Sequence, residues 1–261
     1  MNMTGDSRLM AAGTDSVFQS AGLSVKCDRL ALPKECQRIK IDVGLSVNAP
    51  QSAIWLGADP DLCVIGIEPL TQNIQQLHAG RHTWPTRIDP ALIGKRLFVL
   101  PIALDNVPKP TRASMFVTQD DPGCSSLLEP SSHAVDGTQE VDVWPLSELL
   151  RFIPFDKIPF IEHVKIDAQG KDLSIFESAR DWKSRILAVT LEPESSGYQR
   201  SRNTLKEIQR YMKGSDFIPV HKFLRTYNPP HWKVEIQDPT FVNPEVYFTH
   251  RPQSLFLYQS G

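Results

Sequence analysis

Short apolar runs recur along the chain and alternate with segments whose apolar residues have helical spacing. The apolar runs predict strands at residues 39–43, 63–67, 96–104, 163–167 and 186–191. The segments between and after them predict helices at residues 49–57, 70–79, 146–152, 171–180 and 201–213. Because alternating strands and helices are typical of parallel β-α-β units, we expect an α/β domain.

Several segments depart from this alternation. Additional strands are predicted at 113–118 and 140–144, and Pro101 requires an edge, a bulge or a strand end within residues 96–104. Strand-like residues near 240–248 and 254–258 suggest an antiparallel closing hairpin. The aromatic segment 226–232 fits either a substrate lid or a connector with its rings packed inward.

The first residues of the chain carry a weaker pattern. Residues 1–22 are polar and contain Gly, Ser, Thr and Asp, so we expect a flexible or loosely docked arm. Residues 23–37 fit a short strand or a short helix equally well. We therefore divide the chain into an N-terminal arm, residues 1–37, and a single domain, residues 38–261, which is an ordinary length for one α/β domain.

Composition and charge limit the classes of molecule that the protein is expected to bind. Apolar residues make up 41% of the chain and charged residues 22%, which is typical of a globular protein. A net charge of −2 gives no electrostatic footprint for sequence-independent nucleic-acid binding. No apolar run approaches the ~20 residues of a membrane span, and the N-terminus lacks the pattern of a signal peptide. We expect a soluble, cytoplasmic protein without a nucleic-acid partner; its oligomeric state stays open.

Cysteine and histidine positions show no metal-binding pattern. Cys27, Cys36, Cys63 and Cys124 lack CxxC or CxxH spacing, and no cluster of His, Asp and Glu has ligand spacing. We expect reduced, mostly buried thiols rather than a disulfide framework or a zinc site, and no required metal.

Acidic residues stand at the ends of the predicted parallel strands. Asp42 lies just before Gly44, and Glu68, Asp167 and Glu192 end later strands. Ligands of open α/β sheets bind beyond the carboxyl ends of the strands. These side chains should therefore share one rim of the sheet.

The same residues indicate which cofactor binds. Glu68 can accept two hydrogen bonds from a ribose diol, as in sites for NAD or S-adenosylmethionine. Asp42 would repel a pyrophosphate and attract the methionine ammonium, and Gly44, Ser46 and Ala49 do not form the G-x-G-x-x-G pattern. S-adenosylmethionine is thus favoured over NAD. Helix capping or ion pairing remains an alternative role for Asp42 and Glu68.

An ordered set of motifs resembles the FkbM-type S-adenosylmethionine-dependent methyltransferases. The resemblance runs from about residue 39 to 194, with a weaker echo at 238–244. It is carried by IDVGLSVN, VIGIEPLTQNIQQL, LPIALDN, the CSSL loop, VDVWPLSELL, HVKIDAQGKDLSIFESA and DPTFVNP.

The resemblance implies a fold and an activity. The fold would be the class I methyltransferase (Rossmann-like) fold, a seven-stranded, mostly parallel sheet with an antiparallel C-terminal strand. The activity would be methyl transfer, most often to a hydroxyl oxygen of a small molecule or sugar. By position, the cofactor would contact Asp42, Gly44, Ser46, Asn48, Glu68, Pro69, Ala103, Ser125, Ser126 and Asp167.

Three departures from the family pattern bear on activity. Ser46 stands where the family usually has glycine, Ala49-Pro50 replaces a glycine-led helix start, and Gln169 replaces a glutamate that would supply a base or ligand. They keep open a non-catalytic domain that binds the cofactor or a partner. A nicotinamide-dependent dehydrogenase is the less favoured enzyme alternative.

Methyl transfer requires alignment of the acceptor and removal of a proton. Asp167 is the first candidate for the base or for positioning the substrate. Glu192, Glu194 and His221 follow, although a lone histidine is more often structural or exposed. Lys165, within the same strand as Asp167, is expected to be structural.

Overall fold

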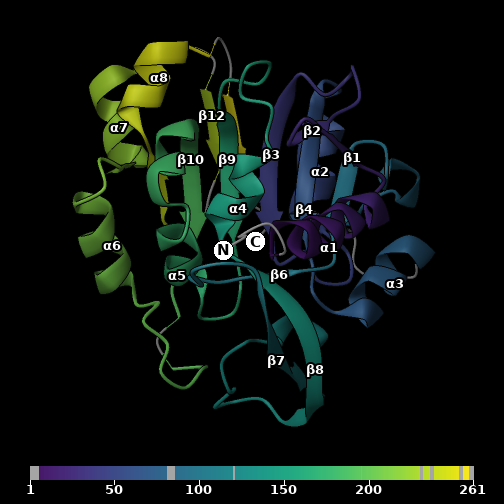
Figure 1. Ribbon diagram of the computed structural model, residues 1–261. Helices are drawn as coiled ribbons and strands as arrows, with labels where there is room; N and C mark the ends of the chain where they lie inside the picture. Colours follow the sequence, from purple (N-terminus) through teal and green to yellow (C-terminus); the bar gives the residue numbers. More distant parts are fainter. Residues whose placement is uncertain are drawn as a thin grey trace, which may run out of the picture.

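The computed structural model describes residues 6–80, 86–119, 121–194, 196–229, 232–235, 238–252 and 255–258. Its centre is a seven-stranded sheet in the order β11-β13-β10-β9-β3-β4-β5 (Figure 1). In chain order the strands are β3 (Arg38–Val43), β4 (Leu62–Ile67), β5 (Leu97–Leu100), β9 (Ile161–Ile166), β10 (Ile186–Leu191), β11 (Ile218–Pro219) and β13 (Thr240–Val242).

The sheet is mixed. The pairs from β5 through β10 are all parallel. Strand β13 runs antiparallel to both of its neighbours, β10 and β11. The α/β class and the predicted sheet of seven strands with a late antiparallel strand are therefore confirmed.

Helices cover both faces of the sheet because alternate strand residues point to opposite sides. Ile41 and Ile65 belong to an apolar cluster with α1 (Asp6–Ser20), α4 (Leu146–Arg151), α5 (Asp172–Glu177) and α6 (Leu205–Lys213). Val64 belongs to a second cluster with α2 (Pro50–Ala58) and α3 (Thr71–Ala79). Leu187 and Val242 pack with α7 (Val220–Tyr227) and α8 (Pro244–His250).

A small sheet extends from one end of the main sheet. Strands β7 (Thr111–Thr118) and β8 (Val135–Trp144) form an antiparallel hairpin, and β6 (Ala103–Leu104) pairs with β8 in parallel. Figure 1 shows β7 and β8 projecting below the main sheet. Both strands predicted here are confirmed and are longer than expected. Residues 96–104 are split at Pro101 between β5 and β6.

The N-terminal segment is docked rather than loose. Phe18 at the end of α1 is fully buried against Trp144 and Phe152, with ring centroids 5.8 and 4.9 Å away. Short strands β1 (Ser24–Lys26) and β2 (Arg29–Ala31) follow. The expected loosely docked arm is therefore wrong from residue 17 onward, whereas the division at residue 37 stays a prediction.

Two cysteines form a disulfide. Cys36 lies in the turn before β3 and Cys63 lies within β4, and their Cα atoms are 5.3 Å apart. The expectation of reduced thiols is wrong for this pair. Cys27 and Cys124 are free.

The C-terminal part differs from the predicted hairpin. Residues 244–250 form α8, capped by the side chain of Asn243, and β14 (Leu255–Tyr258) pairs in parallel with β12 (Trp232–Glu235). The rings of Tyr227 and Trp232 pack on Phe223, which favours the inward-packed connector over a lid. Residues 230 and 231 of that aromatic segment lie outside the described residues.

The remaining short elements are the 3-10 turns η1 (Pro90–Leu92), η2 (Pro122–Cys124) and η3 (Arg180–Arg185). None of the helices in the described ranges combines the length and the apolar character needed to cross a lipid bilayer.

Candidate functional site

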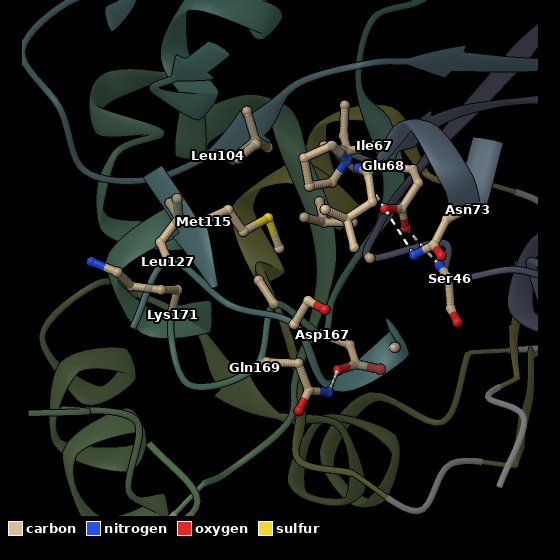
Figure 2. A pocket seen from close by; sticks show the side chains of 18 of the residues that line it. Ser46, Ile67, Glu68, Asn73, Leu104, Met115, Leu127, Asp167, Gln169 and Lys171 are labelled. Atoms are coloured by element: carbon tan, nitrogen blue, oxygen red, sulfur yellow. Dashed lines mark hydrogen bonds between the residues drawn. The ribbon is translucent and has the colours of Figure 1, made fainter. Parts of the chain in front are cut away.

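A cavity lies where the carboxyl ends of β3, β4 and β9 face the small sheet (Figure 2). It encloses about 610 Å³ of space, part of which is open to solvent. Seven of the sequence-predicted cofactor residues line it: Gly44, Ser46, Glu68, Pro69, Ala103, Ser125 and Asp167.

The floor of the cavity is a close contact between two backbone segments. Gly44 has a φ of 83°, and a Cβ built on it would lie 1.9 Å from the carbonyl oxygen of Asp167. The amide of Gly44 donates to Ile67, and the amide of Asp167 donates to Val43, each over 3.1 Å. Only glycine fits this turn, because any side chain would overlap the neighbouring main chain.

Ser46 continues the turn in the left-handed region, with a φ of 55°. Its backbone N–H donates to Oε2 of Glu68 over 2.9 Å. Its Oγ faces the loop of η2, where it would lie 3.0 Å from a Cβ built on Gly123. The backbone at position 46 thus ties the turn to Glu68, and the Ser46 side chain packs against the loop of η2.

Glu68 is 4% exposed and accepts three hydrogen bonds from the protein. Ser46 donates to Oε2, while the amide of Leu70 and the side chain of Asn73 donate to Oε1 over 3.0 and 3.2 Å (Figure 2). Burial raises the pKa of Glu68 to about 7, against the opposing effect of these donors. A carboxylate has about four acceptor positions, so one remains for a ligand hydroxyl.

Asp167 follows β9 and is held by two side chains. Its Oδ2 lies 3.0 Å from Nζ of Lys165, and its Oδ1 accepts from Nε2 of Gln169 over 2.7 Å. Burial alone would raise the pKa of Asp167, but the Lys165 ammonium and the hydrogen bonds hold it below its usual value. Asp167 is therefore an anion at neutral pH.

Glu192, after β10, forms a hydrogen bond with Asp167. Burial and the negative charge of Asp167 raise the pKa of Glu192. Of the two carboxyl groups, Glu192 therefore holds a proton more readily than Asp167 does. Glu192 does not line the cavity, and it interacts with Asp167 instead.

Asp42 is turned away from the cavity. Its Oδ2 accepts from Oγ of Ser52 over 2.6 Å, and its Oδ1 lies 4.0 Å from Nζ of Lys165. Lys165 therefore stands between the two acids: it pairs closely with Asp167, while Asp42 is more distant and burial raises the pKa of Asp42. Although burial disfavours its charge, these two carboxylates raise the pKa of Lys165.

Gln169 is fixed by a residue that the sequence pattern did not reveal. The hydroxyl of Tyr198 lies 2.6 Å from Oε1 of Gln169 and 2.7 Å from the carbonyl oxygen of Cys124. Its single proton is shared between these acceptors. A hydroxyl donor at Oε1 orients the amide so that Nε2 points to Asp167.

Apolar side chains form the wall opposite the acids. Leu104 of β6, Met115 of β7 and Leu127 face the cavity, beside Ala103 (Figure 2). Ser125 joins this wall and its Oγ accepts from the amide of Thr118 over 3.1 Å. The cavity is therefore apolar on one side and acidic on the other.

The remaining predicted residues do not line the cavity. The Oγ of Ser126 donates to the carbonyl oxygen of Gln169 over 2.8 Å, so it holds two loops together. Asn48 is buried, and Ala49 rather than Asn48 is the N-cap of α2. His221 is exposed on α7. Glu194 accepts from the amides of Ser196 and Gly197.

Sequence reasoning missed several polar residues at the cavity. Lys171 directly follows Gly170, and Asn73 lies in the first turn of α3. Their positions beside the sequence motifs could have identified both as residues of the cavity. Tyr198 gave no such signal, because it lies in a loop after β10. Within the described ranges no group of three His, Cys, Asp or Glu side chains is arranged to hold a metal ion.

Comparison with known proteins gives one distant likeness. No family model and no curated protein sequence matches the chain. Among solved structures, methyltransferase FkbM from Methylobacillus flagellatus KT is similar at 16% identity and a TM-score of 0.41, over 80% of this chain and 44% of that one. This chain thus spans less than half the length of that protein. The function is therefore inferred from the cavity itself.

Proposed function

We propose that the chain is an S-adenosylmethionine-dependent methyltransferase of class I fold, acting on a hydroxyl oxygen of a small molecule or sugar. The observation that carries the proposal is one cavity built from three adjacent parallel strands. The Gly44 turn follows β3, Glu68 follows β4 and Asp167 follows β9, as the resemblance implies. The sheet with its late antiparallel strand agrees with the same fold.

The residues that line the cavity fit two parts of the cofactor, its adenine ring and its ribose. The apolar wall of Ala103, Leu104 and Met115 suits an adenine ring, and Glu68 retains an acceptor position for a ribose hydroxyl. The methionine ammonium would meet Asp167 rather than Asp42, since Asp42 is closed off by Ser52 and Lys165.

When bound, the cofactor supplies a methyl group on a positively charged sulfur. The chain then has to orient the acceptor hydroxyl and take its proton as the new O–C bond forms and the S–C bond breaks. The hydroxyl becomes strongly acidic during this displacement, so a carboxylate with a low pKa suffices as proton acceptor. Asp167 has this character, and Gln169 and Lys165 fix its two oxygens.

Calorimetry with S-adenosylhomocysteine, S-adenosylmethionine and NAD tests the proposal. We expect binding of both adenosyl compounds and no binding of NAD, and at least tenfold weaker binding by Glu68→Ala. The matched control is Glu140→Ala, which removes an exposed-face acid of the β7–β8 hairpin. Binding of NAD without either adenosyl compound would overturn the proposal.

A second candidate is a non-catalytic domain that binds the cofactor. Three protein donors already occupy Glu68, and Lys165 lies between Asp42 and Asp167. Labelled-methyl transfer to pooled hydroxyl compounds separates the two functions. Transfer of the label by the wild type that is lost in Asp167→Asn, even at saturating cofactor, supports the enzyme.

A further inference from the structure

A second cavity lies beside the candidate site, on the side of α5. It encloses about 390 Å³, part of it open to solvent. Lys171 lines both cavities, and Gly170 of the second follows Gln169 of the first. The two spaces are therefore neighbours across one short loop, residues 169–171.

The rim of the second cavity is basic. Arg200 and Arg202 are exposed, and neither guanidinium has a hydrogen-bond or ion-pair partner among the described residues. Lys171 pairs with Asp105 over 2.6 Å. Glu177 is the one acid among the described residues that line this cavity. Two arginines are thus available for an anion, and their planar donors match phosphate or carboxylate oxygens.

The floor of the cavity is fixed and partly apolar. Leu128 and Leu173 supply its apolar surface. The side chain of Asn203, which is buried, accepts from the amide of Leu173 over 2.8 Å and donates to the carbonyl oxygen of Glu192. These bonds anchor the segment that carries both arginines to α5 and to the end of β10.

We propose that this second cavity binds an anionic group, phosphate or carboxylate, of the acceptor molecule, with Arg200 and Arg202 as its ligands. The proposal rests on the proposed methyl transfer, because it places the anionic end of the acceptor beside the cavity that contains Asp167. An acceptor with an apolar body next to its anionic group fits the Leu128 and Leu173 floor.

The test uses phenyl phosphate and benzoate as anionic probes and benzyl alcohol as the neutral probe. Amide chemical shifts are followed during titration of the full chain. We expect saturable shifts at residues 171–174 and 200–203 with at least one anionic probe, and none with benzyl alcohol. The tighter of the two anionic probes identifies which group the site prefers.

Charge-matched variants decide between a site and general attraction. We expect Arg200→Ala/Arg202→Ala to weaken binding at least tenfold, and Lys206→Ala/Lys213→Ala, which removes the same charge from exposed positions of α6, to leave it unchanged. Equal weakening by both double variants, or no localised shifts, would overturn the proposal. S-adenosylhomocysteine is titrated in parallel to keep the two proposals separate. If an anionic probe binds and S-adenosylhomocysteine does not, the methyltransferase assignment fails and the anion site stands.

Discussion

The side chain of Gln169 joins Asp167 to Tyr198: its Nε2 lies 2.7 Å from Asp167 Oδ1, and its Oε1 lies 2.6 Å from the Tyr198 hydroxyl. An amide can donate and accept at once, which an ionised glutamate at this position cannot do. Gln169 is therefore suited to hold an anionic Asp167.

Gln169→Glu should destabilise the protein by about 1–3 kcal/mol at pH 8, because it removes the half-buried amide donor of Asp167 and places two carboxylates together. The pKa of the introduced carboxyl would be raised, so the loss should shrink as the pH falls and that group is protonated. Urea unfolding at pH 5.5 and pH 8 measures both effects. Gln37→Glu, at an exposed position, is the control. A loss of equal size at both pH values would argue against the Gln169–Asp167 bond.

Lys165→Met should cost roughly 3–5 kcal/mol at neutral pH, since it leaves Asp42 and Asp167 buried without their cation. In the wild type, Lys165 lowers the pKa of Asp167. The stabilisation from this ion pair is therefore present above the carboxyl pKa of the unfolded chain and is lost as the pH falls through the lower pKa of the folded state. The difference between wild type and variant should therefore hold down to about pH 4 and narrow only below the ordinary carboxyl pKa of 3.8. Exposed Lys34→Met should show no such pH-dependent loss.

Glu68 should leave a signature in the pH dependence of stability. Its pKa is about 7 in the folded protein against 4.5 as the ordinary value, so the folded state binds the proton more tightly. The contribution of Glu68 to the free energy of unfolding is full below about pH 4.5. It falls by roughly 3 kcal/mol as the pH rises to about 7. Subtracting the unfolding curve of Glu68→Gln isolates this slope. A flat difference between pH 4.5 and 7 would show that Glu68 is ionised throughout.

The Cys36–Cys63 disulfide closes a loop across 27 positions and should contribute about 3–4 kcal/mol. Dithiothreitol should lower the free energy of unfolding of the wild type by this amount. The double variant Cys36→Ala/Cys63→Ala should have the lower free energy of unfolding without reductant, and dithiothreitol should not change it. Cys27→Ala, at an exposed free thiol, should behave like the wild type. An unresponsive wild type would mean that the two sulfurs are not joined.

The sheet was largely predictable because its strands are buried on both faces and appear as continuous apolar runs. Residues 39–43, 63–67 and 186–191 were assigned correctly. Glu68 and Asp167 were found because ligand sites lie at carboxyl ends of parallel strands.

What escaped prediction depends on contacts between distant segments. Phe18 lies in a polar helix, and only its packing on Trp144 and Phe152 shows that the segment is docked. The Cys36–Cys63 disulfide joins the turn before β3 to β4, and cysteine spacing does not predict that contact. Asp42 ends a strand as expected, yet the intervening Lys165 removes it from the cavity, and no local pattern announces that ion pair.

The contact between Gly44 and the carbonyl oxygen of Asp167 has an evolutionary consequence. Main-chain atoms alone set the distance between the ends of β3 and β9, so the floor of the cavity does not depend on the side chains around it. Wall residues outside the proposed adenine contact, such as Leu127, are then free to diverge between descendants of this chain. New acceptor preferences can arise by exchanging the walls, while position 44 tolerates no replacement.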